Sequence, residues 1–440
     1  MLTRRRFLGQ SALGMLTLAG GCAPASLVRL KDRAPVVTTD ARSLAVKARR
    51  TALRDRVLGY PINMLMPNDD FFAWRQQLQA VGIGRVAYNN VGNPFERSSM
   101  LYDTRDIEKR VILDFAPLYG FAPDDTWGFV SNSGTDSNMH GMYMGRTLLK
   151  ARTGVLPKAY FTVEAHYSIQ ILQDLLGIER VLVGTRPDGS MDPADLQQKL
   201  AANADSPALV VPTLGTTFKG AIDPLDEIQA ALQGHAAYVH LDAALFGGYL
   251  PYTRHAVELL RGGSSGIPAR YDSIAVSCHK FFGFPAPAGL YLTTAASFEE
   301  FHRHFSRVHN PEYIRHVPGT ITCSRDAVKP AEFHYFTTTG ARAALTENAN
   351  GILQRTGWLL DQLRTRLPQY RATRANELSN TVCFRQPSQA LITKYSLATM
   401  RQSFDGKADE CAHVVVMPHA SEAILSEFLA DLEADTRVPT

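Results

Sequence analysis

Tyr271-Asp-Ser-Ile-Ala-Val-Ser-Cys-His-Lys-Phe-Phe-Gly-Phe-Pro-Ala-Pro-Ala-Gly-Leu290 places one ammonium side chain, that of Lys280, in an otherwise apolar, strand-like stretch. Removal of a lysine from water disfavours its charged form and lowers its pKa, so that a neutral amine can attack a carbonyl carbon. A lysine at a strand end can also extend its ammonium group into solvent along an apolar stem. Residues elsewhere in the chain must decide between these interpretations.

Three groups upstream of Lys280 suit an aldehyde cofactor that carries a pyridine ring and a phosphate. Asp242 ends an apolar run, where its carboxylate can keep a pyridine nitrogen protonated. Ser133-Gly134-Thr135 opens a predicted helix, whose backbone N–H groups and hydroxyls can bind a phosphate. His166 offers a flat imidazole that can stack on a ring. Together with Lys280 these residues predict a site for pyridoxal phosphate (PLP).

The chain resembles the group II PLP-dependent amino-acid decarboxylases, most closely the bacterial histidine decarboxylases and the plant serine decarboxylases. The resemblance runs from about Tyr60 to the end of the chain. Its motifs are Asn-Ser-Gly-Thr-Asp-Ser-Asn (132–138), Ala-His-Tyr-Ser (165–168), Gly-Thr-Thr-Phe-Lys-Gly-Ala-Ile-Asp (215–223), His-Leu-Asp-Ala-Ala-Leu (240–245) and Ser-Cys-His-Lys (277–280). It implies fold type I of the PLP-dependent transferases, which is aspartate aminotransferase-like.

The resemblance implies three catalytic residues. Lys280 would bind the aldehyde of PLP, Asp242 would pair with the ring nitrogen, and His166 would pack on the ring face and contact the substrate. Further cofactor contacts are expected from Ser133, Gly134, Thr135, Thr213, Ala244, Ser277 and His279.

Asn89, Asn90 and Arg325 are further candidate substrate residues. The two asparagines lie in a turn-rich segment that approaches the active-site mouth in the family, although turn chemistry explains them equally well. Arg325 lies in Cys323-Ser-Arg-Asp-Ala-Val328, where relatives have Gly-Ser-Arg-Asn-Gly-His, in a segment expected near the neighbouring subunit's cofactor. A second departure is Asp136-Ser137 in place of Glu-Gly or Glu-Ala.

Strand-like, loop and helix-like segments alternate, which favours an α/β fold with a mostly parallel central sheet. In such sheets a ligand binds beyond the carboxyl ends of the strands. Asp223 is expected to cap a helix that begins at Pro224, and one long helix is expected from about 331 to 367. The predicted parts are an export signal (1–25), an N-terminal arm (26–80), a large PLP-binding domain (81–310) and a small C-terminal α+β domain (311–440).

Composition and charge narrow the classes of partner. The 440 residues are 45% hydrophobic, enough for a large core divided into two or three domains. Three of the four net positive charges come from Arg4, Arg5 and Arg6, so there is no basic surface for nucleic acid. The five cysteines show neither close pairs nor the spacing of a metal site, and no disulfide framework is expected: Cys22, Cys278, Cys323, Cys383 and Cys411.

The first residues predict export. Thr3-Arg-Arg-Arg-Phe-Leu8 and the apolar stretch Gly9–Gly21 are typical of a twin-arginine signal, and the stretch is too short to span a bilayer comfortably. A basic N-terminus with a short helix is the alternative. Ala23-Pro-Ala25 suits cleavage to a soluble periplasmic protein, whereas Ala19-Gly-Gly-Cys22 is an imperfect lipoprotein motif that would tether the protein to a membrane.

These observations lead us to expect an exported PLP-dependent L-amino-acid decarboxylase. The expected substrate is histidine or a small polar amino acid such as serine, and the product is the amine. Because this scaffold also supports transaminases and lyases, another reaction type stays open, as does a catalytically silent binding protein. The resemblance further implies at least a homodimer.

Overall fold

The computed structural model describes residues 40–97, 100–263, 269–309, 312, 317–404 and 407–435. The predicted export signal, and Cys22 with it, lies outside these residues. Helix α1 (Ala41–Ala52) belongs to one compact unit, and Leu53–Thr440 form a second. None of the described helices is long and apolar enough to cross a membrane.

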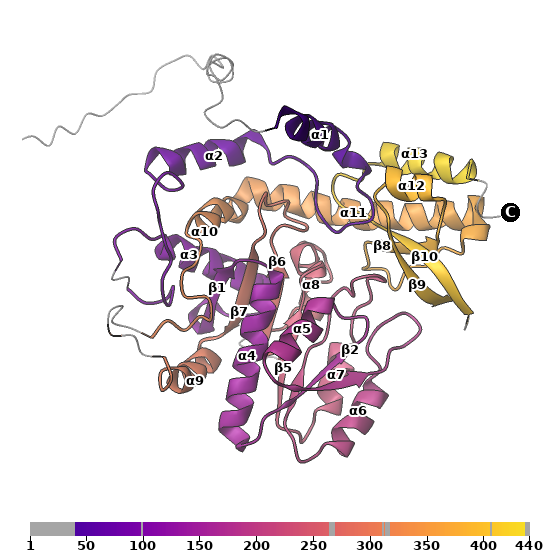
Figure 1. Cartoon of the computed structure of the whole chain (residues 1–440). Coiled ribbons are helices and arrows are strands. Elements are labelled where there is room, and N and C mark those ends of the chain that lie inside the picture. Colours follow the sequence, from indigo (N-terminus) through magenta and orange to yellow (C-terminus); the bar gives the residue numbers. More distant parts are fainter. Residues whose placement is uncertain are drawn as a thin grey trace, which may run out of the picture. The chain divides into compact units, whose positions relative to one another are not determined.

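A seven-stranded sheet forms the centre of the second unit (Figure 1). Its order is β1-β7-β6-β5-β4-β2-β3, and among these described strands only the pairs that include β7 are antiparallel. The predicted α/β fold with a mostly parallel sheet is therefore confirmed. The strands are β1 (Thr126–Ser131), β2 (Lys158–Thr162), β3 (Glu179–Val183), β4 (Ala208–Val210), β5 (Ala237–Asp242), β6 (Ser273–Ser277) and β7 (Gly289–Thr294).

Helix α4 (Gly134–Thr153) packs across β5, β6 and β7 and determines where the site lies. It can approach the sheet closely because Gly141 faces the ring of His240, and a Cβ at Gly141 would lie 2.2 Å from that ring. The remaining helices of this part are α2 (Asp69–Ala80), α3 (Arg105–Phe115), α5 (Tyr167–Leu175), α6 (Pro193–Ala202), α7 (Leu225–Ala231), α8 (Ala256–Leu259) and α9 (Ala295–Phe305).

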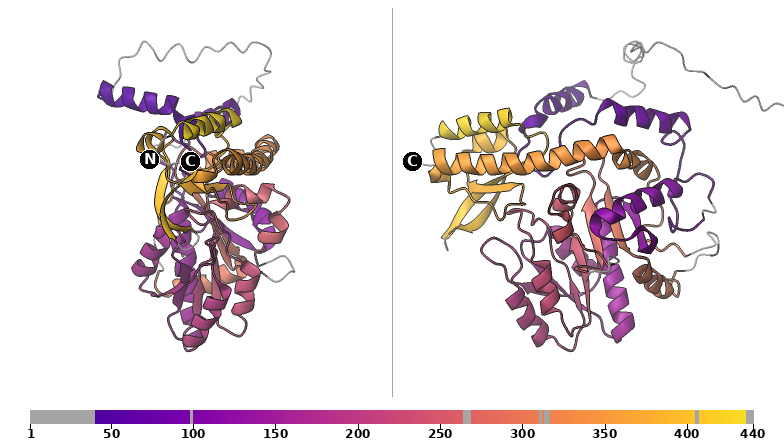
Figure 2. Two further views of the ribbon diagram at one scale, coloured as in Figure 1. Left: turned by 90° about the vertical axis from the view of Figure 1, so that its right-hand side faces the viewer. Right: turned by 180° about the vertical axis from the view of Figure 1, so that it is seen from behind.

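The long helix expected from 331 to 367 is divided in two. Helix α10 (Val328–Phe333) is followed by a tight turn, and α11 (Thr339–Arg366) begins after Thr338, whose side chain accepts a hydrogen bond from the N–H of Ala341. Figure 2 shows α11 running from α10 to the C-terminal sheet.

A smaller antiparallel sheet follows α11, with the order β8-β10-β9. Its elements are β8 (Thr381–Arg385), α12 (Gln389–Lys394), β9 (Ala398–Phe404), β10 (Lys407–Val415) and α13 (Glu422–Glu433). The smaller C-terminal α+β part is thus confirmed. One apolar core includes Leu290 of the large sheet and Val414 of the small one, so the two sheets share buried surface.

Candidate active site

Lys280 lies in the turn that joins β6 to β7 rather than within a strand. Strand β6 ends at Ser277, and the chain reverses before β7. The N–H of Cys278 donates to the carbonyl of Ala288 (2.9 Å), and the N–H of Asn63 donates to the carbonyl of Lys280 (3.0 Å). The turn therefore holds the lysine backbone at the carboxyl end of the sheet.

A cavity of about 180 Å³ lies at this end of the sheet. Nine of the predicted site residues line it, together with Asn138, Ser168 and Pro287, which the sequence did not single out. The full lining is Ser133, Gly134, Thr135, Asn138, His166, Ser168, Asp242, Ala244, Ser277, His279, Lys280 and Pro287. The structure thus brings the predicted amine, carboxylate, imidazole and phosphate turn to one space.

Lys280 and His166 in this cavity have shifted pKa values, and the Asp242 carboxylate affects both. Burial lowers the pKa of Lys280, and the nearby Asp242 carboxylate partly opposes that shift. Burial also lowers the pKa of His166, with Asp242 raising it and Lys280 lowering it further. Within the described part of the chain, no ion pair of 4.0 Å or less joins Lys280 to Asp242. The amine is therefore closer to its neutral, nucleophilic form than an exposed lysine would be.

The phosphate turn is organised as a helix N-cap. The Ser133 side chain accepts from the N–H of Asp136 (3.3 Å), and the Asp136 carboxylate accepts from the backbone N–H of Asn132 (2.9 Å). The other carboxylate oxygen of Asp136 accepts from the hydroxyl of Thr322 (3.0 Å). A Cβ at Gly134 would lie 2.4 Å from the Ser277 hydroxyl oxygen. A larger residue here would displace the Ser277 hydroxyl, and the N–H of Gly134 lies at the positive end of a helix.

Thr213 lies beside Asp242 without lining the cavity. Its N–H donates to the carboxylate of Asp223 (2.7 Å), whereas its hydroxyl oxygen is buried without a protein partner. Burial raises the pKa of Asp223 to about 7, although hydrogen bonds from Thr213 and Met191 oppose the shift. The prediction that Asp223 caps the next helix is wrong, because its carboxylate accepts from these two backbone N–H groups instead.

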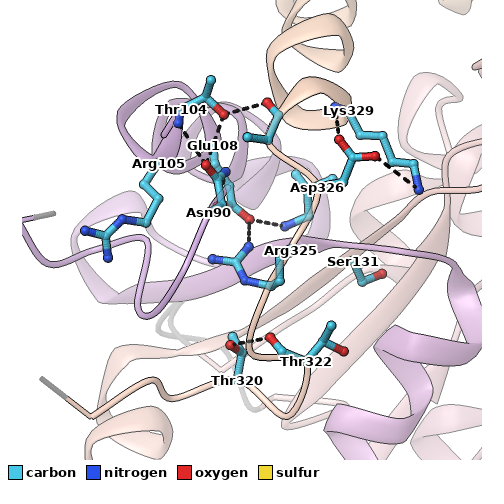
Figure 3. Close-up of polar contacts among 12 residues, drawn as sticks. Asn90, Thr104, Arg105, Glu108, Ser131, Thr320, Thr322, Arg325, Asp326 and Lys329 are labelled. Atoms are coloured by element: carbon cyan, nitrogen blue, oxygen red, sulfur yellow. Dashed lines mark hydrogen bonds and ion pairs between the residues drawn. The ribbon is translucent and has the colours of Figure 1, made fainter. Parts of the chain in front are cut away.

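Asn89, Asn90 and Arg325 are not among the residues that line the cavity. Figure 3 shows Asn90 and Arg325 beside Glu108 instead. Arg325 forms a buried ion pair with Glu108 and donates to the carbonyl of Gly92 (2.9 Å). The Asn90 amide donates to the same Glu108 carboxylate (3.0 Å), and the Asn89 amide donates to a serine hydroxyl. Their contact with substrate stays a prediction.

The chain matches the family model described as "Pyridoxal-dependent decarboxylase conserved domain" over residues 145–323. It is 30% identical over 383 residues to a histidine decarboxylase of Solanum lycopersicum, covering 85% of this chain and 84% of the relative. A histidine decarboxylase of Pseudomonas fluorescens is 31% identical (79% and 82% covered), as is serine decarboxylase 1 of Oryza sativa subsp. japonica (85% and 71%).

The chain belongs to the pyridoxal-dependent decarboxylases. Solved structures agree on the fold: an L-methionine decarboxylase of Streptomyces sp. 590 superposes with a TM-score of 0.76 at 22% identity, covering 92% of this chain and 96% of that one. The predicted PLP-dependent amino-acid decarboxylase is confirmed, and a transaminase or a silent binding protein is set aside.

The cavity of this pyridoxal-dependent decarboxylase fits its cofactor, because an amine (Lys280), a carboxylate (Asp242) and the start of helix α4 with its hydroxyls (Ser133–Thr135) line one space. PLP supplies an electron-withdrawing ring that takes up the electron pair left when the substrate loses its carboxylate. Lys280 would bind the aldehyde, and the Ser133–Thr135 turn would bind the phosphate. Asp242 would hold the proton on the ring nitrogen, a preorganised charge contribution.

Proposed function

We propose that this decarboxylase acts on L-histidine, releasing CO2 and leaving histamine. The observation that carries the proposal is the matching of histidine decarboxylases from a plant and from bacteria over most of the chain. Lys280 binds the cofactor, His166 contacts the ring and the substrate, and Asp242 supports the charge. The side chain of histidine is larger than that of serine, so histidine would fill more of the space beside the cofactor.

Serine is the second candidate, because one departure counts against histidine if the segment around Arg325 contacts the substrate. The resemblance to the related decarboxylases implies Asn, Gly and His where Asp326, Ala327 and Val328 stand. Here the Asp326 carboxylate accepts from the N–H groups of Val328 and Lys329, so it caps α10 instead of offering an amide donor. Three serine decarboxylases of Oryza sativa subsp. japonica also match at 29–32% identity.

Product analysis with each amino acid separates these candidates. The purified PLP-loaded enzyme is incubated with L-histidine, L-serine and the other amino acids, while released CO2 and amine are measured together. Histamine and CO2 in equal amounts support the proposal, and ethanolamine supports serine. A keto acid without CO2 would contradict decarboxylation, and the Lys280→Ala variant is the blank.

We propose that the enzyme is exported by the twin-arginine pathway to the periplasm. The support is the Arg4-Arg5-Arg6 run followed by the apolar stretch Gly9–Gly21. N-terminal analysis of protein from fractionated cells should find a chain that starts after Ala25, or one that starts at a lipid-modified Cys22. An intact Met1 in the cytoplasmic fraction would refute export.

We propose that the enzyme is a homodimer or a higher homo-oligomer. The support is an apolar face on α5, where Tyr167, Ile171 and Leu175 are 57–68% exposed at four-residue spacing. Leu175 also lines an apolar hollow of about 660 Å³ with Val308, which is 75% exposed. Monomers of soluble proteins rarely expose such patches. Ile171→Lys should lower the sedimentation coefficient toward that of a monomer. A sedimentation coefficient that stays that of the dimer would exclude this face as the subunit interface.

A further inference from the structure

The side chain of Asn138 forms part of the cavity wall. Asn138 lies on α4 four residues after Gly134, and therefore on the same face of the helix. Only 2% of its surface is exposed, yet it lines the cavity with the phosphate turn and Ser277. The uncovered part of this residue thus faces the space that receives the cofactor.

The buried ring of His240 forms a hydrogen bond with the amide of Asn138. The His240 ring is fully buried, with Nε2 at 3.0 Å from Asn138 Oδ1 and Nδ1 at 2.8 Å from the Ser273 hydroxyl oxygen. Burial lowers the pKa of His240 to about 3, so at neutral pH one ring nitrogen donates and the other accepts. When the Ser273 hydroxyl donates to Nδ1, the N–H at Nε2 donates to Asn138 Oδ1.

In this arrangement the amide oxygen of Asn138 accepts a hydrogen bond from the His240 ring. The amide nitrogen then lies on the other side of the same group, and Asn138 is one of the residues that line the cavity. An amide nitrogen carries two N–H donors, and at a cavity wall these can donate to a group inside the cavity. A ligand oxygen in the cavity would accept one of these hydrogen bonds.

The surroundings indicate which ligand group this is. Next to Asn138 the cavity is formed by the start of α4, with the hydroxyls of Ser133, Thr135 and Ser277. Hydroxyls and helix-terminal N–H groups of this kind bind an anion. We propose that Asn138 is a cofactor-binding residue whose side-chain N–H donates to the phosphate group of PLP, and that His240 is a positioning residue that orients this amide.

Cofactor titration of the apoenzyme tests the proposal. PLP and pyridoxal, which lacks the phosphate, are added separately, and binding is followed by visible absorbance. For Asn138→Ala the dissociation constant of PLP should rise about 10- to 100-fold, while that of pyridoxal should change less than about twofold. His240→Phe should show the same selective loss, and His240→Gln, which keeps a donor, should recover part of it.

The matched control is Asn350→Ala, an exposed asparagine on α11 that should leave both constants unchanged. Equal weakening of PLP and pyridoxal binding, or no weakening, would overturn the proposal. If apo Asn138→Ala does not fold, Asn138→Ser takes its place. Failure of both to fold would assign Asn138 to the core and also overturn the proposal. This test measures cofactor binding and does not use a substrate. Failure of the enzyme to turn over histidine would therefore leave the proposal about Asn138 unchanged.

Discussion

His140 and His240 are buried side chains whose protonation lowers the free energy of unfolding. Burial lowers the pKa of each to about 3. Because this lies below the unfolded value of about 6.5, the unfolded chain binds more protons between these limits. The free energy of unfolding should therefore fall as the pH drops from 6.5 toward 3, by about 2 kcal/mol per histidine at pH 5. Urea unfolding of the apoenzyme at pH 7 and pH 5 measures this loss.

His140→Phe isolates one of these contributions. Neither ring nitrogen of His140 has a protein partner, and the ring stacks on Trp127 at 5.6 Å between centroids. Phenylalanine keeps the stacking and removes the titrating group. Between pH 7 and pH 5, the free energy of unfolding of the variant should fall by about 2 kcal/mol less than that of the wild type. The partly exposed His235→Phe is the control, and an unaltered pH profile for His140→Phe would disprove the assignment.

At the scale of elements, the cap of α4 links the phosphate turn to the segment around Thr322. Asp136 is one methylene shorter than the glutamate common in similar decarboxylases, and the Thr322 hydroxyl reaches its carboxylate. Asp136→Ala should destabilise the apoenzyme by about 1 kcal/mol and weaken PLP binding, because the N–H of Asn132 loses its carboxylate acceptor and the turn is held less firmly. Thr322→Val should weaken PLP binding less. PLP affinity equal to that of the wild type in both variants would show that this cap does not organise the site.

The ion pair between Glu108 and Arg325 joins α3 to the segment before α10. Both side chains are buried, so Glu108→Gln should cost about 3–5 kcal/mol of unfolding free energy by leaving an unpaired guanidinium. Denaturant unfolding measures this cost, and an exposed pair such as Arg366 with Glu433 is the control. If Arg325 instead contacts substrate, Arg325→Lys should raise KM while stability stays near that of the wild type.

Much of the site could be predicted because its residues follow local signals. Asp242 and Ser277 end apolar strands, and Ser133-Gly134-Thr135 opens a helix. Contacts between distant segments were not predictable in this way. The Asp223 carboxylate binds N–H groups of two other loops, and Arg325 pairs with a residue 217 positions away. Asn138 was missed because its helical spacing from Gly134 does not show that α4 lies close enough to β5 for His240 to hold its side chain at the cavity.

At the scale of the whole molecule, the cofactor would join parts of the chain that are distant in sequence. The start of α4, the loop before α5, the end of β5 and the turn after β6 all line one cavity. Removal of PLP should therefore lower stability, and PLP at about 1,000 times its dissociation constant should add about 4 kcal/mol to the apparent free energy of unfolding. Urea unfolding with and without PLP checks this, and equal stability would contradict binding across these elements.

The central claim is that Lys280 binds the aldehyde of PLP in the cavity that Asp242 shares. Borohydride reduction of the PLP-loaded enzyme, followed by peptide mass spectrometry, tests it most directly because the reduced cofactor stays on the amine that held it. A phosphopyridoxyl group on Lys280, absent from Lys280→Ala, is the predicted result. A label on another lysine, or none in an enzyme that still releases CO2, would contradict the account.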